Sequence, residues 1–352
     1  MPMDETLKSK APASPGHRRS LTSLRHFVPG QLLEVTMRCF QSHFLLVPSE
    51  ELERTFIGVL GKAQQLYKMK ICYFVSLSNH AHLSLLPDDK DQLEGFQRYF
   101  ACNLSREVGR LRGWREGIFR RRYSSVPVTD APEAEAARIA YLIGQGMKEG
   151  VCPCPLQWIG PHAIKSLVRG QFLVEGGVWT DRTALGEARR EHQRYRSAGN
   201  PRIKRRRPKQ KDFQTPVTVE LSKIPSLSHL SDGQYAEAMR DLLEAKKLEH
   251  AEVIETISEG WQRKVRSLVA TSTPKHTKRR PKPFCHAATK AAREQYRATR
   301  KAWIDAYDAA SERFRQGVLE AIAEFPENAY LPRFGKIPDI PPTSLAPIPD
   351  TS

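Results

Sequence analysis

Two histidines separated by one residue are the first candidates for chemistry in this sequence. His80 and His82 lie in the run 73–87, which is typical of two strands, 73–75 and 81–86, joined by turn residues 76–79. Side chains alternate between the faces of a strand, so both imidazoles are expected on one face. Two such imidazoles can share a divalent metal ion. The alternative is two exposed strand histidines, or a core histidine beside a surface one.

A tyrosine and a glutamine four residues apart form the second candidate pair. Tyr141 and Gln145 lie in a predicted helix from residue 133 to about residue 148, so they share a helical face. A carboxamide oxygen can bind a hard divalent cation, and tyrosine can act as a covalent nucleophile. Gly144 and Gly146 weaken helical order by ~1 kcal/mol each, so the helix is expected to fray near Gln145. The alternative for Tyr141 is an ordinary half-buried core residue.

The elements expected to position these residues follow a definite order. Strands are predicted at 32–40, 70–75, 81–86 and about 119–128, and helices begin near residues 50, 90 and 133. The resulting order of strand, helix, strand, strand, helix, strand, helix favours an α+β fold with a ferredoxin-like antiparallel sheet. Helices would pack on one face of that sheet, and the other face would be free to hold a site. If the third helix crosses that open face, the tyrosine and the glutamine meet the histidines.

The rest of the chain is expected to be basic and loosely organised. Residues 1–27 are predicted to form a flexible basic arm, 28–162 the α+β domain, and 163–352 a basic, mainly helical extension. Linkers are expected near 196–211 and 273–283, with long helices at 234–269 and 287–325. The segment 196–211 holds eight Lys or Arg residues, which is typical of a solvated linker and also of a phosphate-binding segment.

The charge of the chain indicates a polyanionic partner. The net charge is +17, from 56 Lys and Arg residues against 39 Asp and Glu residues, which favours nucleic acid over an anionic membrane surface. No apolar run approaches the ~20 residues of a membrane span, and no signal-peptide core is present near the start. We therefore expect no membrane partner and a cytoplasmic protein that joins the nucleoid when it is bound to DNA. The arginines expected to contact DNA, unless they form solvated runs, are Arg120, Arg121, Arg122, Arg205, Arg206 and Arg207.

These motifs taken together resemble the HUH signature of single-tyrosine transposases, and most closely the REP-associated tyrosine transposases. The resemblance is carried by Asn79-His80-Ala81-His82, by the aromatic and basic run 117–123, and by Tyr141-Leu-Ile-Gly-Gln145. Further matches at 148–151 and 155–158 keep the family's order across residues 28–162. Two positions depart from the pattern. Gln145-Gly146 stands where the family often has Asn-Pro, and Ala81 is smaller than its usual apolar residue.

The resemblance implies an activity, a cofactor and a substrate. Mg²⁺ or Mn²⁺ would be held by His80, His82 and Gln145, and Tyr141 would attack a phosphodiester of single-stranded or hairpin DNA. The product would be a 5′-phosphotyrosine and a free 3′-hydroxyl, and rejoining would need no further cofactor. The resemblance leaves open whether the active site is built within one chain or across a homodimer.

Two other functions remain open from the sequence. A ferredoxin-like sheet with a basic surface is also the plan of non-enzymatic proteins that bind single-stranded nucleic acid. That function requires exposed aromatic residues on the central strands. The third possibility is a domesticated transposase relative whose C-terminal half recruits partners.

Overall fold

The computed structural model describes residues 25–120, 122–129, 131–197, 206–274 and 283–332. The chain separates into two compact units. One unit runs from Val28 to Ala298, and the other joins residues 1–27 to residues 299–352. All the candidate site residues belong to the first unit. In the second unit, Trp303 stacks on Tyr307, whose ring meets Phe325 edge-on.

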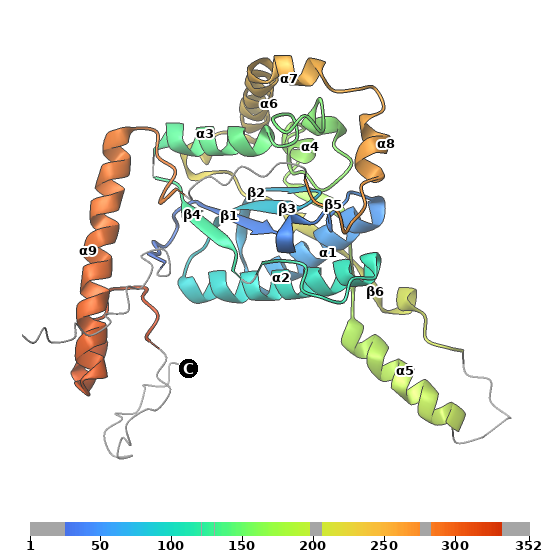
Figure 1. The fold of residues 1–352 in the computed structure, drawn as a ribbon, viewed down its shortest axis with the longest axis horizontal. Coiled ribbons are helices and arrows are strands. Elements are labelled where there is room, and N and C mark those ends of the chain that lie inside the picture. The colour runs from blue at the N-terminus through green and yellow to red at the C-terminus, as the bar shows by residue number, and fades with distance from the viewer. Residues whose placement is uncertain (1–24, 121, 130, 198–205, 275–282, 333–352) are drawn as a thin grey trace, which may run out of the picture. The chain divides into compact units, whose positions relative to one another are not determined.

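A four-stranded antiparallel sheet forms the centre of the first unit (Figure 1). Its strands are β1 (Leu33–Arg38), β2 (Lys70–Leu77), β3 (His80–Leu86) and β4 (Ser124–Pro127), in the order β2-β3-β1-β4. A two-residue turn joins β2 to β3. In the register, Thr36 lies opposite His82, and Arg38 lies opposite His80. The predicted ferredoxin-like order is therefore confirmed.

Two helices, α1 (Glu50–Tyr67) and α2 (Lys90–Arg112), cover one face of this sheet. Each begins at a side-chain cap, where Ser49 accepts from the Leu52 N–H and Asp89 accepts from the Gln92 N–H. The Phe56 ring of α1 lies 6.0 Å from Phe74 of β2 and 5.4 Å from a ring of α2. These buried aromatic contacts fix the sheet against the helices.

The opposite face of the sheet lies beneath α3 (Pro132–Ile143), and α6 (Asp232–Glu249) packs against α3 (Figure 1). The predicted helix 133–148 is too long, because α3 ends at Ile143. The chain then turns, and Gly146 adopts a left-handed φ of 91° that other residues rarely take. The two glycines that were expected to fray the helix thus end it.

A second, two-stranded sheet comes from the region after residue 162, where the sequence shows little periodicity. β5 (Leu173–Thr180) pairs antiparallel with β6 (Gln214–Glu220) and packs on α1. The contact is close at Gly58, where an added Cβ would lie 2.2 Å from the Val178 carbonyl oxygen. Because this sheet borders the α1 side of the core, it belongs to the same compact unit as the first.

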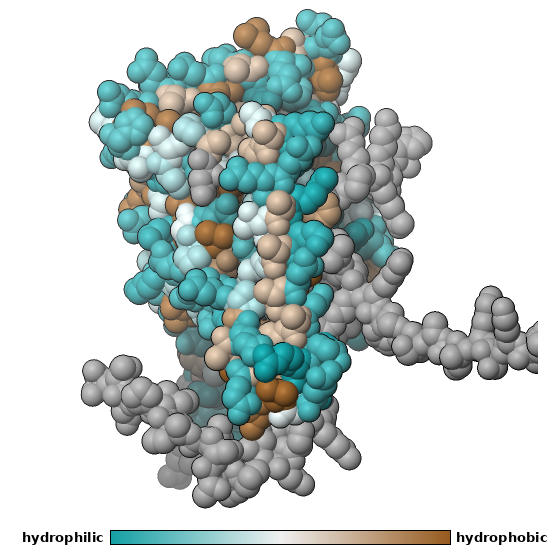
Figure 2. Space-filling view, turned by 90° about the vertical axis from the view of Figure 1, so that its left-hand side faces the viewer, coloured by the Kyte–Doolittle hydropathy of each residue, from teal (hydrophilic) through white to brown (hydrophobic). Residues whose placement is uncertain are grey.

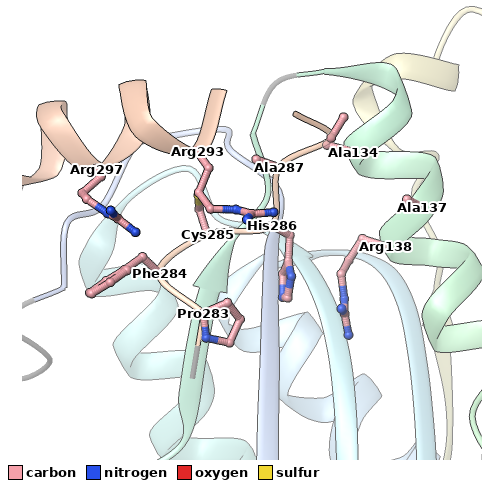
Figure 3. Close-up of a pocket in the computed structure, with 11 residues that line it drawn as sticks. Ala134, Ala137, Arg138, Pro283, Phe284, Cys285, His286, Ala287, Arg293 and Arg297 are labelled. Atoms are coloured by element: carbon pink, nitrogen blue, oxygen red, sulfur yellow. The ribbon is translucent and has the colours of Figure 1, made fainter. Parts of the chain in front are cut away.

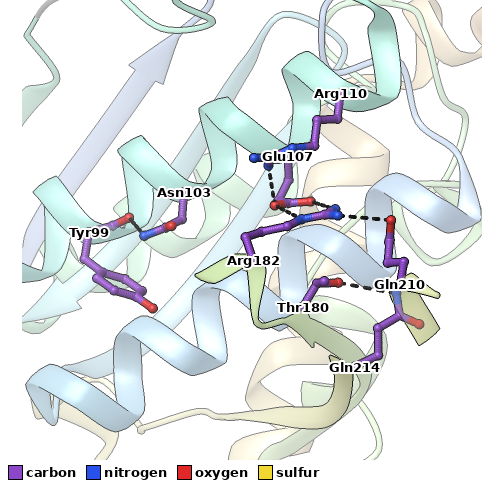
Figure 4. Close-up of polar contacts among 8 residues, drawn as sticks. All are labelled: Tyr99, Asn103, Glu107, Arg110, Thr180, Arg182, Gln210 and Gln214. Carbon is purple, nitrogen blue, oxygen red and sulfur yellow. Dashed lines mark hydrogen bonds and ion pairs between the residues drawn. The ribbon is translucent and has the colours of Figure 1, made fainter. Parts of the chain in front are cut away.

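Helix α5 (Arg182–Ser197) connects these two strands and projects away from the core (Figure 1). Its first residue is held by an ion pair with α2, where Arg182 Nε donates to Glu107 Oε1 at 2.8 Å (Figure 4). Arg182 also donates to the Gln210 side chain, and Gln214 donates to Thr180 beside it. The base of the α5 segment is therefore fixed to the core.

The remaining helices are shorter than the sequence predicts. In place of one helix over 234–269, α6 is followed by α7 (Ala251–Glu255) and α8 (Trp261–Arg266). Helix α9 (Lys290–Arg315) is followed by a short 3₁₀ turn, Leu319–Glu324. The minor helices are α4 (Ile164–Leu167) and the 3₁₀ turns 40–42, 155–157, 210–213 and 225–227.

Hydrophilic residues cover most of the molecular face drawn in Figure 2, with apolar residues scattered among them. Among the described helices, none combines the length and the apolar composition that crossing a bilayer requires.

Candidate active site

The two histidines lie side by side on the α3 face of the sheet. The His80 and His82 ring centroids are 4.9 Å apart, and the ring planes are nearly perpendicular. They share a face because side chains alternate along a strand. Ala81, which lies between them, and Leu83, which follows, are fully buried on the other face. The two imidazoles therefore share one face of β3, as the strand period predicts.

Each imidazole is held through its Nδ1 atom. The His80 Nδ1 lies 2.6 Å from Asn79 Oδ1, and the His82 Nδ1 lies 2.7 Å from Glu34 Oε1. The Asn79 amide is oriented by its own Nδ2, which donates to the Ser42 carbonyl at 3.4 Å. An amide oxygen and a carboxylate only accept, so each Nδ1 carries a proton that it donates to its partner. Metal-binding histidines are typically held by such outer partners.

Glu34 is the residue at this site that the sequence analysis missed. Its carboxylate lies 2.6 Å from Arg138 Nε and 2.8 Å from His286 Nε2, and the Thr36 hydroxyl donates to it at 3.2 Å. Burial opposes ionisation of Glu34, but hydrogen bonds from His286 and His82 and the Arg138 charge outweigh it, so its pKa lies well below the usual range. The only sequence signal is an acid within the apolar run 32–35.

The electrostatic environment keeps His80 neutral. Burial and the nearby charges of His82 and Arg38 lower the pKa of His80 well below its ordinary value, although its contacts with Gln145 and Glu34 act in the opposite direction. At neutral pH the imidazole therefore holds one proton, on Nδ1. A neutral imidazole is the form that binds metal ions.

Gln145 lies in the turn after α3, with its side chain only 2% exposed. Its Nε2 donates to the Tyr141 carbonyl at 3.4 Å. Its side chain also lies within hydrogen-bonding reach of the His80 imidazole, and this contact raises the His80 pKa against the larger effect of burial. A carboxamide beside an imidazole is the pairing that the predicted ligand set requires, because a carboxamide oxygen can bind a hard divalent cation.

Tyr141 comes from the last turn of α3 and faces the histidines. Its ring centroid lies 6.3 Å from that of His82, and the side chain is half-buried. The Arg138 guanidinium carbon lies 3.7 Å from the centre of the tyrosine ring, and Lys148 Nζ lies 4.8 Å from it. Arg138 thus contacts both the tyrosine and Glu34. Two cations beside the ring also make this position attractive to a phosphate.

Of the arginines predicted to bind DNA, only Arg120 and Arg122 lie in the part of the chain next to the sheet that the structure describes. Both are exposed, and the Arg120 N–H donates to the Arg38 carbonyl, beside the strand position opposite His80. Arg121 lies outside the described residues.

Arg206 and Arg207 do not reach the histidines. Arg206 and Arg207 are exposed and lead into β6, which packs on α1, on the far side of the four-stranded sheet from α3. Arg206 lies 3.6 Å from Asp212, and Arg205 falls outside the described residues. Among the described residues, the cations that contact Tyr141 or act on His80 include Arg138, Lys148 and Arg38, which the sequence analysis did not single out.

The donor set fits a metal ion that accepts both nitrogen and oxygen. Within the described residues, no group of three His, Cys, Asp or Glu side chains is placed to hold a metal. The candidate set instead combines two imidazole nitrogens with one carboxamide oxygen. Imidazole nitrogens suit Zn²⁺ and similar ions, and a carboxamide oxygen suits Mg²⁺ or Mn²⁺, so the set is compatible with a divalent ion without selecting one.

Comparison with known proteins gives a distant structural likeness. A solved structure of a REP-associated tyrosine transposase bound to a REP hairpin aligns with 42% of this chain and 86% of that chain, at 16% sequence identity and a TM-score of 0.34. No family model matches the sequence, and no curated protein matches it. At this level the similarity is a distant likeness in fold and says nothing of activity.

Proposed function

We propose that this protein is a metal-dependent DNA strand transferase that cleaves and rejoins single-stranded or hairpin DNA through a 5′-phosphotyrosine. The observation that supports it most directly is the convergence of Tyr141 with two imidazoles whose Nδ1 atoms are both held. Outer hydrogen bonds of this kind are what orients a metal ligand. The basic composition of the chain, with a net charge of +17, suits a DNA substrate.

The proposed reaction exchanges one phosphodiester for another. The Tyr141 oxygen attacks phosphorus, the bond from phosphorus to the 3′-oxygen breaks, and that oxygen leaves as a hydroxyl after it takes up a proton. The phenolic proton passes to water or to a neighbouring base. Rejoining reverses these steps, with a 3′-hydroxyl as the nucleophile, so no external energy source is needed.

His80, His82 and Gln145 would hold the metal ion. When bound, the ion would act as a Lewis acid and neutralise charge on a phosphate oxygen. The chain's own cations add to this effect, because Arg138 and Lys148 both lie within 5 Å of the Tyr141 ring centre. They would draw the phosphate to the nucleophile.

The binding-only alternative is less well supported by the sheet. Stacking of single-stranded bases on a ferredoxin-like sheet needs exposed aromatic side chains on its strands. The two aromatic residues in the described strands of this sheet, Tyr73 and Phe74, are 0% and 1% exposed. Its α3 face instead carries the titratable groups described above.

Loss of either histidine tests the proposed function. We expect His80→Ala and His82→Ala to abolish the covalent DNA adduct and to weaken Mn²⁺ binding at least tenfold. DNA affinity should stay within about twofold, because Lys and Arg residues elsewhere supply the phosphate contacts. Adduct formation would be measured on denaturing gels with a labelled hairpin, and Mn²⁺ binding by titration calorimetry.

His229→Ala is the matched control, because His229 is exposed and lies outside the site. It should leave metal binding, DNA binding and the adduct unchanged. Adduct formation at the wild-type level by both site variants would refute the proposed role of the histidines. An equal loss of DNA binding and cleavage would show that they are structural.

The basic segment 196–211 is expected to govern non-specific affinity. Replacing its eight Lys and Arg residues by serine should reduce the slope of log affinity against log salt by about 0.7 for each phosphate contact that is lost on single-stranded DNA. Fluorescence anisotropy at several salt concentrations measures this slope. An unchanged slope would assign the segment the role of a passive linker.

A further inference from the structure

A cavity of about 490 Å³ lies next to the candidate active site, between α3 and the segment 283–297 (Figure 3). Ala134, Ala137 and Arg138 of α3 form one wall. Phe284 and the arginines of α9 lie across from them in Figure 3. The volume lies in the range of pockets that hold small ligands, and it suffices for a single nucleotide. The metal-site residues do not line it.

The lining of this cavity is rich in cations. Of the described residues that line it, three are arginines, Arg138, Arg293 and Arg297, and none is Asp or Glu. Arg138 is directed at the buried Glu34 carboxylate, which offsets its charge, and His286 Nε2 lies 2.8 Å from the same carboxylate. Arg293 and Arg297 are exposed and one helical turn apart on α9, so they supply the charge available to a ligand. Arginine pairs of this kind bind phosphate with good geometry.

The cavity also offers an aromatic face. Phe284 is 42% exposed, and the Arg297 guanidinium lies 5.7 Å from its ring centre. An exposed phenylalanine beside arginines suits a ligand that joins a flat apolar ring to an anion. A nucleotide has this composition, and the stacking of a base on an aromatic ring contributes about 1–3 kcal/mol.

The wall that carries Phe284 is held against the sheet. The His286 N–H donates to the Pro127 carbonyl at 2.8 Å, and the Thr129 N–H donates to the His286 carbonyl at 2.9 Å. This segment thus extends the edge beyond β4 by a short parallel bridge. Its attachment fixes Phe284 in place, and a preformed wall lowers the entropic cost of binding.

We infer that this cavity binds one nucleotide of the DNA strand, its base on Phe284 and its phosphate on Arg293 and Arg297. The assignment to a DNA strand rests on the proposed function. The cavity lies beside the nucleophile, because Arg138 lines the cavity and also stacks on the Tyr141 ring. The bound nucleotide is therefore a near neighbour of the cleaved phosphate. The cavity would set which base is accepted there.

Photocrosslinking of the full chain tests this inference without metal and without cleavage. The probes are short single strands that carry 5-iododeoxyuridine at successive positions, and crosslinked peptides are mapped by mass spectrometry. We expect crosslinks to Phe284 from one or two adjacent positions only. Arg293→Ala/Arg297→Ala should reduce that yield at least fivefold. The matched control is Arg189→Ala/Arg190→Ala, which removes two exposed arginines of α5 and should leave the yield unchanged.

The outcomes separate this inference from the proposed function. A Phe284 crosslink in a wild-type protein that never forms an adduct would support the cavity and reject the proposed enzyme. If both proposals hold, the crosslink should persist in Tyr141→Phe while the adduct is lost. The cavity assignment would be overturned if no probe position crosslinks to Phe284, or if the two double variants give equal crosslink yields. Either result would overturn it even if the adduct forms. Full competition by micromolar mononucleotide would also overturn it, since the ligand would then be a free nucleotide.

Discussion

Replacement of Tyr141 by phenylalanine is expected to abolish the covalent protein–DNA adduct completely. The change removes one oxygen and keeps the ring on which Arg138 and Lys148 stack. DNA affinity and Mn²⁺ affinity should therefore stay within about twofold of the wild type, and stability should change by less than about 1 kcal/mol. Denaturing gels measure the adduct, anisotropy and calorimetry measure the two affinities, and urea unfolding measures stability.

Other tyrosines in residues 28–162 are alternative candidates for the nucleophile, and the structure argues against two of them. Tyr73 is fully buried, its hydroxyl lies 3.2 Å from His162 Nδ1, and burial raises its pKa well above the ordinary value. Tyr99 belongs to α2, which covers the other face of the sheet, and its ring lies 6.0 Å from Trp179. Tyr123→Phe is the matched control and should retain the adduct. Peptide mapping that finds DNA on any tyrosine other than Tyr141 would refute the assignment.

Replacement of Glu34 by glutamine is expected to damage both the metal site and the fold. The carboxylate orients His82 and offsets Arg138 and His286, all at 2.6–2.8 Å. Loss of an outer partner of a metal-binding histidine typically lowers metal affinity 10- to 100-fold. Removal of one member of a buried ionic cluster leaves the others uncompensated, at a cost of about 3–5 kcal/mol. Calorimetry with Mn²⁺ and urea unfolding measure the two effects.

Glu53→Gln is the control for this change, because it removes a carboxylate from a half-exposed ion pair. Glu53 lies 3.3 Å from Lys165, with side-chain exposures of 30% and 29%. Such pairs contribute about 0–1 kcal/mol, and this one lies outside the site. Wild-type Mn²⁺ affinity together with wild-type stability in Glu34→Gln would show that the carboxylate neither orients His82 nor offsets the buried cations.

The local sequence determined the arrangement of the histidines and the order of the elements. A strand repeats every two residues, so His80 and His82 had to share a face wherever the strand was placed. The order of strands and helices likewise favoured one antiparallel topology, β2-β3-β1-β4, which the structure has. Gly144 and Gly146 predicted the weak point of α3, and the helix ends there because glycine adopts the turn that follows.

The tertiary structure decided what surrounds those histidines. Glu34 reaches His82 only because β1 pairs with β3 in one register, and a shift by one residue would turn its side chain to the other face. Arg138 and His286 meet Glu34 from α3 and from a segment docked at the edge beyond β4. These contacts join residues far apart in the chain. Sequence periodicity describes only neighbours along one element, so the partners of His82 and Glu34 can be identified only once the elements pack.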